Sequence, residues 1–265
     1  MRRSLLPLAF TLLAAVPLVS SQEAWADDFR ALNSSLWTLS SDVEHCSDGA
    51  CFLARPDHAS FGAGGLTLHL DQTPCNKTSC CDAKGKCASW ASGHLVSVDT
   101  VLYGTFRARM RPAHVGSSGG PPKNAFSCWT PSYIGKPHNE IAVCFSGSSP
   151  SASNVHCSYW YDSTAHTKQV EMPAGWSWVD FHDYEVVWAP TFITFAVDGE
   201  VILRVDGTTS TIPYTAGHVL TILRPKDDVY LSDSAFDVAS MSYDPSFGEA
   251  EAPGEAGAPD AVRSA

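Results

Sequence analysis

Short runs of alternating apolar and polar residues, separated by turns, restrict this chain to β-structure from about residue 28 to 245. The stretch GGLTLHLD places Leu66, Leu68 and Leu70 on one face, because successive side chains of a strand point to opposite sides. No segment repeats apolar residues with the 3.6-residue period of a helix, and glycine and proline recur too often for long helices. The pattern predicts one all-β domain, a sandwich or jelly roll.

Two later stretches support the same prediction. In YGTFRARMRP, Phe106, Ala108 and Met110 fall on one face, and the polar face carries Thr105, Arg107 and Arg109 together with Tyr103. FITFAVDGEVILRVDG contains Asp198-Gly199 between two runs of β-branched and aromatic residues. Such a pair favours a type I′ turn, which needs positive φ at both central residues, so we expect a hairpin here.

The two ends of the chain have a different composition. Residues 1–21 combine a basic start, an apolar run and a small-residue cleavage site near Ser21, which predicts a secretory signal peptide. The apolar run is too short, and too broken by Pro7 and Pro17, to favour a membrane anchor. Residues 246–265 are rich in Ala, Glu, Pro and Gly and are predicted to be disordered. We therefore expect a secreted protein, extracellular or in the cell wall, with one folded domain over 22–245.

The net charge is −11, and cleavage after the signal peptide would remove Arg2 and Arg3 and make it more negative. A protein this acidic is repelled by phosphate backbones and anionic lipid surfaces, which argues against nucleic-acid and membrane partners. An uncharged polysaccharide is the partner that the charge favours. We expect the protein to be a monomer.

All nine cysteines follow the predicted signal peptide, and in an exported chain they are expected to form disulfides. No Cys-x-x-Cys pair occurs, so we expect no metal site, and no cofactor motif is present. Because nine is odd, at least one thiol is free or pairs outside the chain. The tripeptides Asn33-Ser34-Ser35 and Asn76-Lys77-Thr78 predict N-glycosylation on surface loops.

The segment HNEIAVCFSG, residues 138 to 147, reads as a strand with two different faces. Ile141, Val143 and Phe145 form an apolar face suited to the core. Glu140, Ala142 and Cys144 share the opposite face. We expect this second face to line a cleft.

HNEIAVCFSG resembles the catalytic strand of glycoside hydrolase family 16, which has the form Glu-x-Asp-x-Glu. The flanking segments also resemble that family, in order, over roughly residues 27 to 240: DDFRALNSSLWTLS, GGLTLHL, SGHLVSVDTVLYGTFRARMRPA, NAFSCWTPS and FHDYEVVWAPTFITFAVDG. The resemblance implies a jelly-roll sandwich of two antiparallel sheets with a concave carbohydrate cleft. It also implies retaining chemistry on β-linked glucans, either hydrolysis or transglycosylation.

Carried over by the resemblance, Glu140 takes the position of the nucleophile, whereas Ala142 replaces the middle Asp and Cys144 replaces the acid/base Glu. Retaining enzymes need two carboxyl groups about 5–5.5 Å apart. A thiol with a pKa of about 8.5 is a poor proton donor by comparison. The motif is therefore degenerate, and we expect ordinary hydrolysis to be impaired.

Three alternatives remain open for Cys144. It could form a disulfide with Cys128 or Cys157, remain an unpaired and inert thiol, or act as a nucleophile with His138 or His156 as base.

Further candidates for substrate binding come from neighbouring segments. In VHCSYWYD, residues 155 to 162, His156, Ser158 and Trp160 share a face, and Ser158 stands where the family usually has a cleft Asn. Trp129 precedes the catalytic strand. Aromatic faces beside polar groups suit the apolar C–H faces of sugar rings. Packing in the core is the alternative for both tryptophans.

We therefore expect a secreted, family 16-like protein that acts on or binds β-glucan-type polysaccharide, with weak or lost hydrolase activity. One alternative is an active retaining endo-β-glucanase or transglycosylase with Glu140 as nucleophile. The other is a lectin-like or structural wall protein whose cleft binds no glucan.

Overall fold

A computed structural model describes residues 22–41, 43–47, 50–72, 88–115, 125–135, 137–147, 154–208, 211–226 and 233–247. The predicted signal peptide, the sequon residue Asn76 and nearly all of the predicted disordered tail lie outside these ranges. Within them, no helix is long and apolar enough to cross a bilayer.

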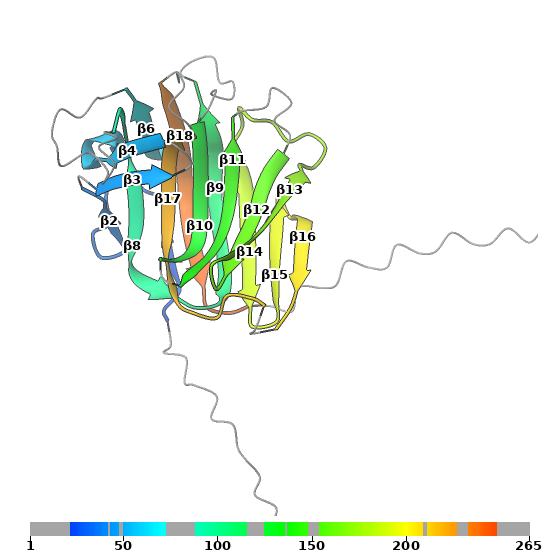
Figure 1. The fold of residues 1–265 in the computed structure, drawn as a ribbon. Helices are drawn as coiled ribbons and strands as arrows, with labels where there is room; N and C mark the ends of the chain where they lie inside the picture. Colours follow the sequence, from blue (N-terminus) through cyan, green and yellow to red (C-terminus); the bar gives the residue numbers. More distant parts are fainter. Residues whose placement is uncertain are drawn as a thin grey trace, which may run out of the picture.

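The described residues form two sheets packed face to face (Figure 1). The larger, eleven-stranded sheet has the spatial order β16 (Glu200–Asp206), β15 (Phe192–Val197), β14 (His182–Ala189), β9 (Gly104–His114), β18 (Ser234–Asp244), β6 (Gly65–Asp71), β7 (Trp90–Ser92), β4 (Ala50–Ala54) and β3 (Val43–Ser47). It is completed by β1 (Trp25–Asp27), which pairs with β18, and β5 (Ala59–Gly62), which pairs with β6.

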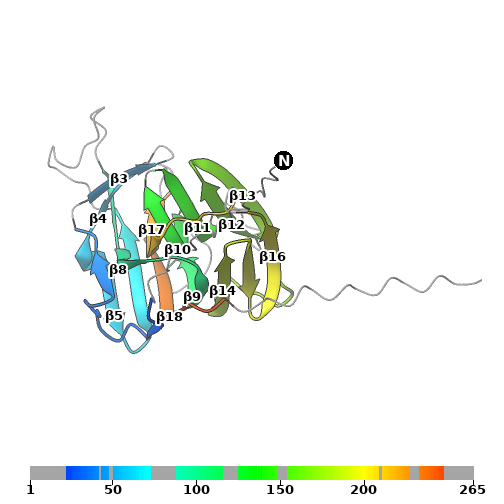
Figure 2. The same cartoon turned by 90° about the horizontal axis from the view of Figure 1, so that it is seen from below.

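The smaller, seven-stranded sheet has the order β13 (Thr164–Glu171), β12 (Asn154–Tyr161), β11 (His138–Ser146), β10 (Ala125–Gly135), β17 (Gly217–Pro225), β8 (His94–Val101) and β2 (Trp37–Leu39). A short 3-10 turn, η1 (Pro56–His58), precedes β5. Figure 2 shows the layers from below the view of Figure 1. Among the strands that the structure describes, every pairing is antiparallel except β4 with β7, which is parallel. The all-β sandwich predicted from the alternation is thus confirmed, with this one parallel pair as the difference.

The core lies between the two sheets, where the predicted apolar faces meet. Leu66, Leu68 and Leu70 of β6 are buried, as are the apolar residues of β9. On the smaller sheet the apolar face of HNEIAVCFSG is buried in the same cluster. A one-residue shift would turn every one of these side chains to the opposite face of its sheet, so their place in this cluster confirms the predicted faces.

The predicted hairpin joins β15 and β16, with φ of 50° at Asp198 and 82° at Gly199. Asp198 also has a tertiary role, because its carboxylate accepts hydrogen bonds from the backbone N–H of Asp183 and from the His182 ring. The other ring nitrogen of His182, Nε2, lies 3.0 Å from the carbonyl oxygen and 3.2 Å from the backbone nitrogen of Ser177. The turn is therefore fastened to the neighbouring strand β14.

Candidate functional site

The outer face of the smaller sheet, meaning the face turned away from the core, carries the polar side of β11. Strand register places Glu140 beside Tyr133 of β10 and Trp160 of β12. Further along β11, Ala142 is opposite Ser158. Directly opposed residues on neighbouring strands point to the same side of a sheet, so these side chains form successive rows across the outer face. The fold thus brings Glu140, Ser158 and Trp160 together, as the sequence predicts.

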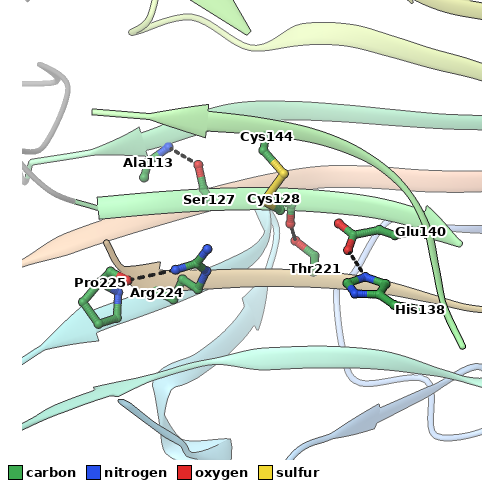
Figure 3. Close-up of a disulfide and its surroundings, with 9 residues drawn as sticks. All are labelled: Ala113, Ser127, Cys128, His138, Glu140, Cys144, Thr221, Arg224 and Pro225. Atoms are coloured by element: carbon green, nitrogen blue, oxygen red, sulfur yellow. Dashed lines mark hydrogen bonds and ion pairs between the residues drawn. A yellow bond between two sulfur atoms is a disulfide. The ribbon is translucent and has the colours of Figure 1, made fainter. Parts of the chain in front are cut away.

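Cys144 is bonded to Cys128 in a disulfide that joins β11 to β10 (Figure 3). The two residues face each other across the strand pair, with their Cα atoms 4.2 Å apart. Of the alternatives for Cys144, pairing with Cys128 is confirmed, and the thiol-based alternatives are wrong for this structure. The free cysteine of the described residues is Cys157, which is buried on the core side of β12.

Glu140 is hydrogen-bonded to a histidine of its own strand (Figure 3). Nε2 of His138 donates to Oε2 of Glu140 at 2.8 Å. The imidazole also stacks on the indole of Trp160, with ring centroids 4.5 Å apart and planes within 1° of parallel. Tyr133 approaches the same imidazole edge-on at 5.5 Å. These four side chains form one cluster, and the structure places His138 at its centre.

The sequence suggests His138 only as a base for Cys144 and does not predict its contact with Glu140. The signal that could have found it is the period of two, because residues 138 and 140 of one strand share a face. The stacking on Trp160 depends on pairing between strands, which the period does not give.

Tyr133 supplies a hydroxyl to this cluster. Burial, and to a smaller extent the negative charge of Glu140, raises the pKa of the Tyr133 phenol. The hydroxyl therefore stays protonated at neutral pH and can donate a hydrogen bond.

At the other end of the outer face, His156 lies opposite Cys144 on β12. Burial, followed by the positive charge of Lys226, lowers the pKa of the His156 imidazole. The ring is therefore neutral at neutral pH and offers both a donor and an acceptor.

The outer face has a single carboxylate in the rows where the catalytic motif would have three. Glu140 is followed on that face by the Ala142 methyl group and the disulfide. Asp162 lies in the turn after β12, where its N–H donates to Asn139. Glu171 pairs with Asn154, which lies six residues along β12 from Trp160, the partner of Glu140. At 3.3 Å per residue this separation is about 20 Å. Among the described residues, neither of these next acids of the chain can replace the missing one.

Trp129 is not part of this face. It lies opposite Val143 on the core side of the sheet and is only 1% exposed. A ring buried to this degree has no surface to offer a sugar, so its proposed contact with substrate is corrected to the core-packing alternative. The physical reason is that successive side chains of a strand point to opposite faces, so Trp129 points to the core when its neighbour Cys128 points outward.

The remaining predicted site residue that the structure describes is Asn33, which is exposed, as a glycosylation site requires. It lines a cavity of about 690 Å³ on the outer face of the larger sheet. Two ion pairs, Arg107–Glu185 and Arg109–Asp183, join residues that line this cavity. The cavity belongs to the opposite side of the sandwich from Glu140 and is separate from the cluster around it.

The sequence model of Glycosyl hydrolases family 16 matches residues 47–231, and the chain belongs to that family. The beta-glucanase of Bacillus subtilis (strain 168) is 25% identical over 218 residues, covering 80% of each protein. A beta-glucanase of Acetivibrio thermocellus is 26% identical over 201 residues, which are 74% of this chain and 53% of that protein. The chain thus spans about half the length of the Acetivibrio relative.

Solved structures of similar fold include the beta-glucanase of Bacillus licheniformis, with a TM-score of 0.67 and 20% identity over 84% of this chain and 99% of that one. LamA of Zobellia galactanivorans in complex with laminaritriose and laminaritetraose gives a TM-score of 0.65 at 12% identity, over 83% of this chain and 98% of that one. At these identities the likeness shows the fold, which is the jelly roll expected from the sequence.

Proposed function

We propose that this chain is a secreted family 16 protein that binds β-glucan-type polysaccharide on the outer face of the smaller sheet and no longer hydrolyses it by the retaining route. The observation that carries the proposal is the Cys128–Cys144 disulfide, which occupies the acid/base position beside Glu140. Secretion rests on the predicted signal peptide, and N-terminal sequencing of the exported protein should find a start near Gln22.

The acid/base position has no proton donor, because the disulfide occupies it. In the retaining reaction one carboxylate attacks the anomeric carbon while a carboxylic acid about 5–5.5 Å away protonates the leaving oxygen. A disulfide sulfur carries no proton to give. General acid–base assistance is worth roughly 10²–10⁴-fold, so its loss alone would reduce hydrolysis by about that factor.

Around Glu140, the outer face carries aromatic and polar side chains of the kind that bind sugars. Trp160 and Tyr133 provide aromatic surface, and Glu140 provides a partly exposed acceptor beside them, whereas Ser158 in the adjoining row is only 7% exposed. Aromatic surface with a few convergent polar groups is the composition of sugar sites. The net charge of −11 favours a neutral polymer. Relatives named beta-glucanase and the LamA complex with laminarin oligosaccharides point to β-glucan as the first polymer to test.

The first test incubates the purified secreted protein with β-1,3-glucan and with mixed-linkage glucan. We expect retention on the insoluble polymer with no new reducing ends and no chain transfer. Robust turnover that Glu140→Gln abolishes would overturn the loss of catalysis. Absence of both turnover and retention would favour the lectin-like or structural alternative.

The second test rebuilds the motif in the triple variant Cys128→Ser, Ala142→Asp, Cys144→Glu. Cys128 is included because replacing Cys144 alone would leave its partner as a free thiol. We expect hydrolysis at least ~10²-fold above background, since the acid is restored. The control, Cys128→Ser with Cys144→Ser, removes the disulfide without adding a carboxyl and should remain inactive. A triple variant that folds and binds glucan but stays inert would show that the outer face lacks more than the acid.

A further inference from the structure

The contacts of His138 resemble those that a bound sugar would make. The imidazole lies flat on the indole of Trp160, with centroids 4.5 Å apart, where the C–H face of a pyranose would stack. Its Nε2–H donates to Glu140 at 2.8 Å, where a sugar hydroxyl would donate. One side chain of the protein thus occupies both the aromatic platform and the acceptor.

The backbone of His138 is fixed while its side chain is accessible. The N–H of His138 donates to Oγ of Ser163, and its carbonyl accepts from the Ser163 N–H at 2.9 Å. The side chain retains 30% of its exposure. Rotation about the side-chain torsions can therefore move the imidazole toward solvent without breaking the strand.

We propose that the His138 side chain fills the sugar site in the unbound protein, and that polysaccharide binds by displacing its imidazole from Trp160 and Glu140. This inference rests on the proposed function. His138 is then a residue that sets affinity and specificity. When only a small fraction of the protein is in the conformation that can bind, the apparent dissociation constant equals the intrinsic one divided by that fraction. A stacked aromatic pair and a charge-assisted hydrogen bond must both be given up, so this fraction is about one tenth or less.

The test compares His138→Ala with the parent protein in titrations with a soluble β-1,3-glucan, by calorimetry or affinity electrophoresis. We expect affinity to rise about tenfold, because the alanine leaves Trp160 and Glu140 open. His138→Ser is a second variant, with a side chain close to alanine in size. Thermal unfolding at the temperature of the parent protein verifies that both variants are folded. Equal or weaker binding by the folded variants, with the parent binding normally, would overturn the inference and leave the proposed function intact.

The matched control is His166→Ala. His166 also stacks on an aromatic ring, that of Tyr159, with centroids 4.7 Å apart and planes within 10°. Tyr159 packs toward the core rather than the outer face, so this histidine covers no part of the sugar site. Its replacement should leave glucan affinity unchanged, and a rise equal to that of His138→Ala would contradict the role assigned to His138.

A second readout needs no ligand. The stacked imidazole should quench the fluorescence of Trp160. The His138→Ala variant should therefore fluoresce more strongly than the parent protein. In a Trp160→Phe background the same substitution should leave the fluorescence unchanged. No brightening would show that the stack is absent and overturn the inference directly. If brightening occurs but neither the parent nor the variant binds glucan, the proposed function fails and displacement by polysaccharide fails with it, although the stack stands.

Discussion

At the scale of single residues, three cysteines close together in the smaller sheet have different chemistry because of the side of the sheet they face. Cys128 and Cys144 point outward from paired strands and are bonded to each other. Cys157, on the next strand, points into the core. Which face a cysteine occupies therefore decides whether it is a cross-link or an isolated thiol.

Cys157 is predicted to be unreactive in the folded protein. Burial raises the pKa of its thiol to about 12, so at pH 8 roughly one thiol in ten thousand is ionised, and the thiolate is the reactive form. Iodoacetamide treatment followed by peptide mass spectrometry should find Cys157 unmodified in native protein and modified after denaturation. Rapid native labelling at this residue would show that the core around β12 opens readily.

At the scale of elements, the β15–β16 hairpin shows how a turn residue becomes part of tertiary structure. Asp198 supplies the positive φ that the turn needs and also holds His182 and Asp183 of β14. Burial acts to raise the pKa of the Asp198 carboxyl, but the hydrogen bonds from Asp183 and His182 outweigh it and lower the pKa below its usual value. The carboxylate thus favours the folded state when it is ionised.

Asp198→Asn is predicted to lower the free energy of unfolding by about 1 kcal/mol at pH 7, the net value of a hydrogen bond to a half-exposed group. Asn also tolerates positive φ, so the turn itself should persist. Because the folded pKa is depressed, this contribution is present above the unfolded pKa of about 3.9 and is lost as the pH falls through the lower, folded value. Urea unfolding between pH 2.5 and 7 should show the two proteins converging in acid. A gap that is constant with pH would contradict this account.

At the scale of the whole molecule, stability comes from burial between two sheets, whereas the candidate site lies on an outer face. Leu68, which is fully buried at the middle of β6, represents the core. Glu140, His138 and Trp160 keep part of their surface exposed. Stability and binding should therefore be separable by mutation.

Leu68→Ala should reduce the free energy of unfolding by about 2–5 kcal/mol, because it removes buried methyl groups and leaves a cavity. The control Leu32→Ala changes a leucine that is 40% exposed, and its effect should stay within about 0.5 kcal/mol. Both variants, where folded, should bind glucan like the parent. If Leu68→Ala costs no more than the control, the leucine does not belong to a tightly packed core.

Local patterning was enough to predict much of the fold. The alternation in β6, β9 and β11 assigned core and outer faces correctly, since burial on one side of a strand forces a period of two. The Asp198-Gly199 pair located a hairpin because few residues accept positive φ. The parallel pair of β4 with β7, the one such pair among the described strands, has no such local signal, because it joins segments distant in the chain.

The candidate site was predictable only in part. The period of two placed Glu140, Ala142 and Cys144 on one face, and Ser158 and Trp160 together on another strand, and the family resemblance implied that the two strands are neighbours. The sequence could not choose between Cys128 and Cys157 as the partner of Cys144, nor keep Trp129 out of the site, because both depend on the register between strands. The same holds for the cluster around His138. Its hydrogen bond to Glu140 lies within β11, whereas its stack on Trp160 joins β11 to β12 and so depends on the register.

By itself, then, the sequence determined the class of fold, the family and the absence of two of the three acids from the catalytic strand. Each of these follows from short segments, whose patterns can be recognised from residues close together along the chain. Only the tertiary structure decided that Cys144 is closed in a disulfide, that Trp129 is buried and that His138 covers Trp160 and Glu140. The physical reason is that these facts depend on how β10, β11 and β12 align, and that alignment is fixed by packing of the whole sandwich.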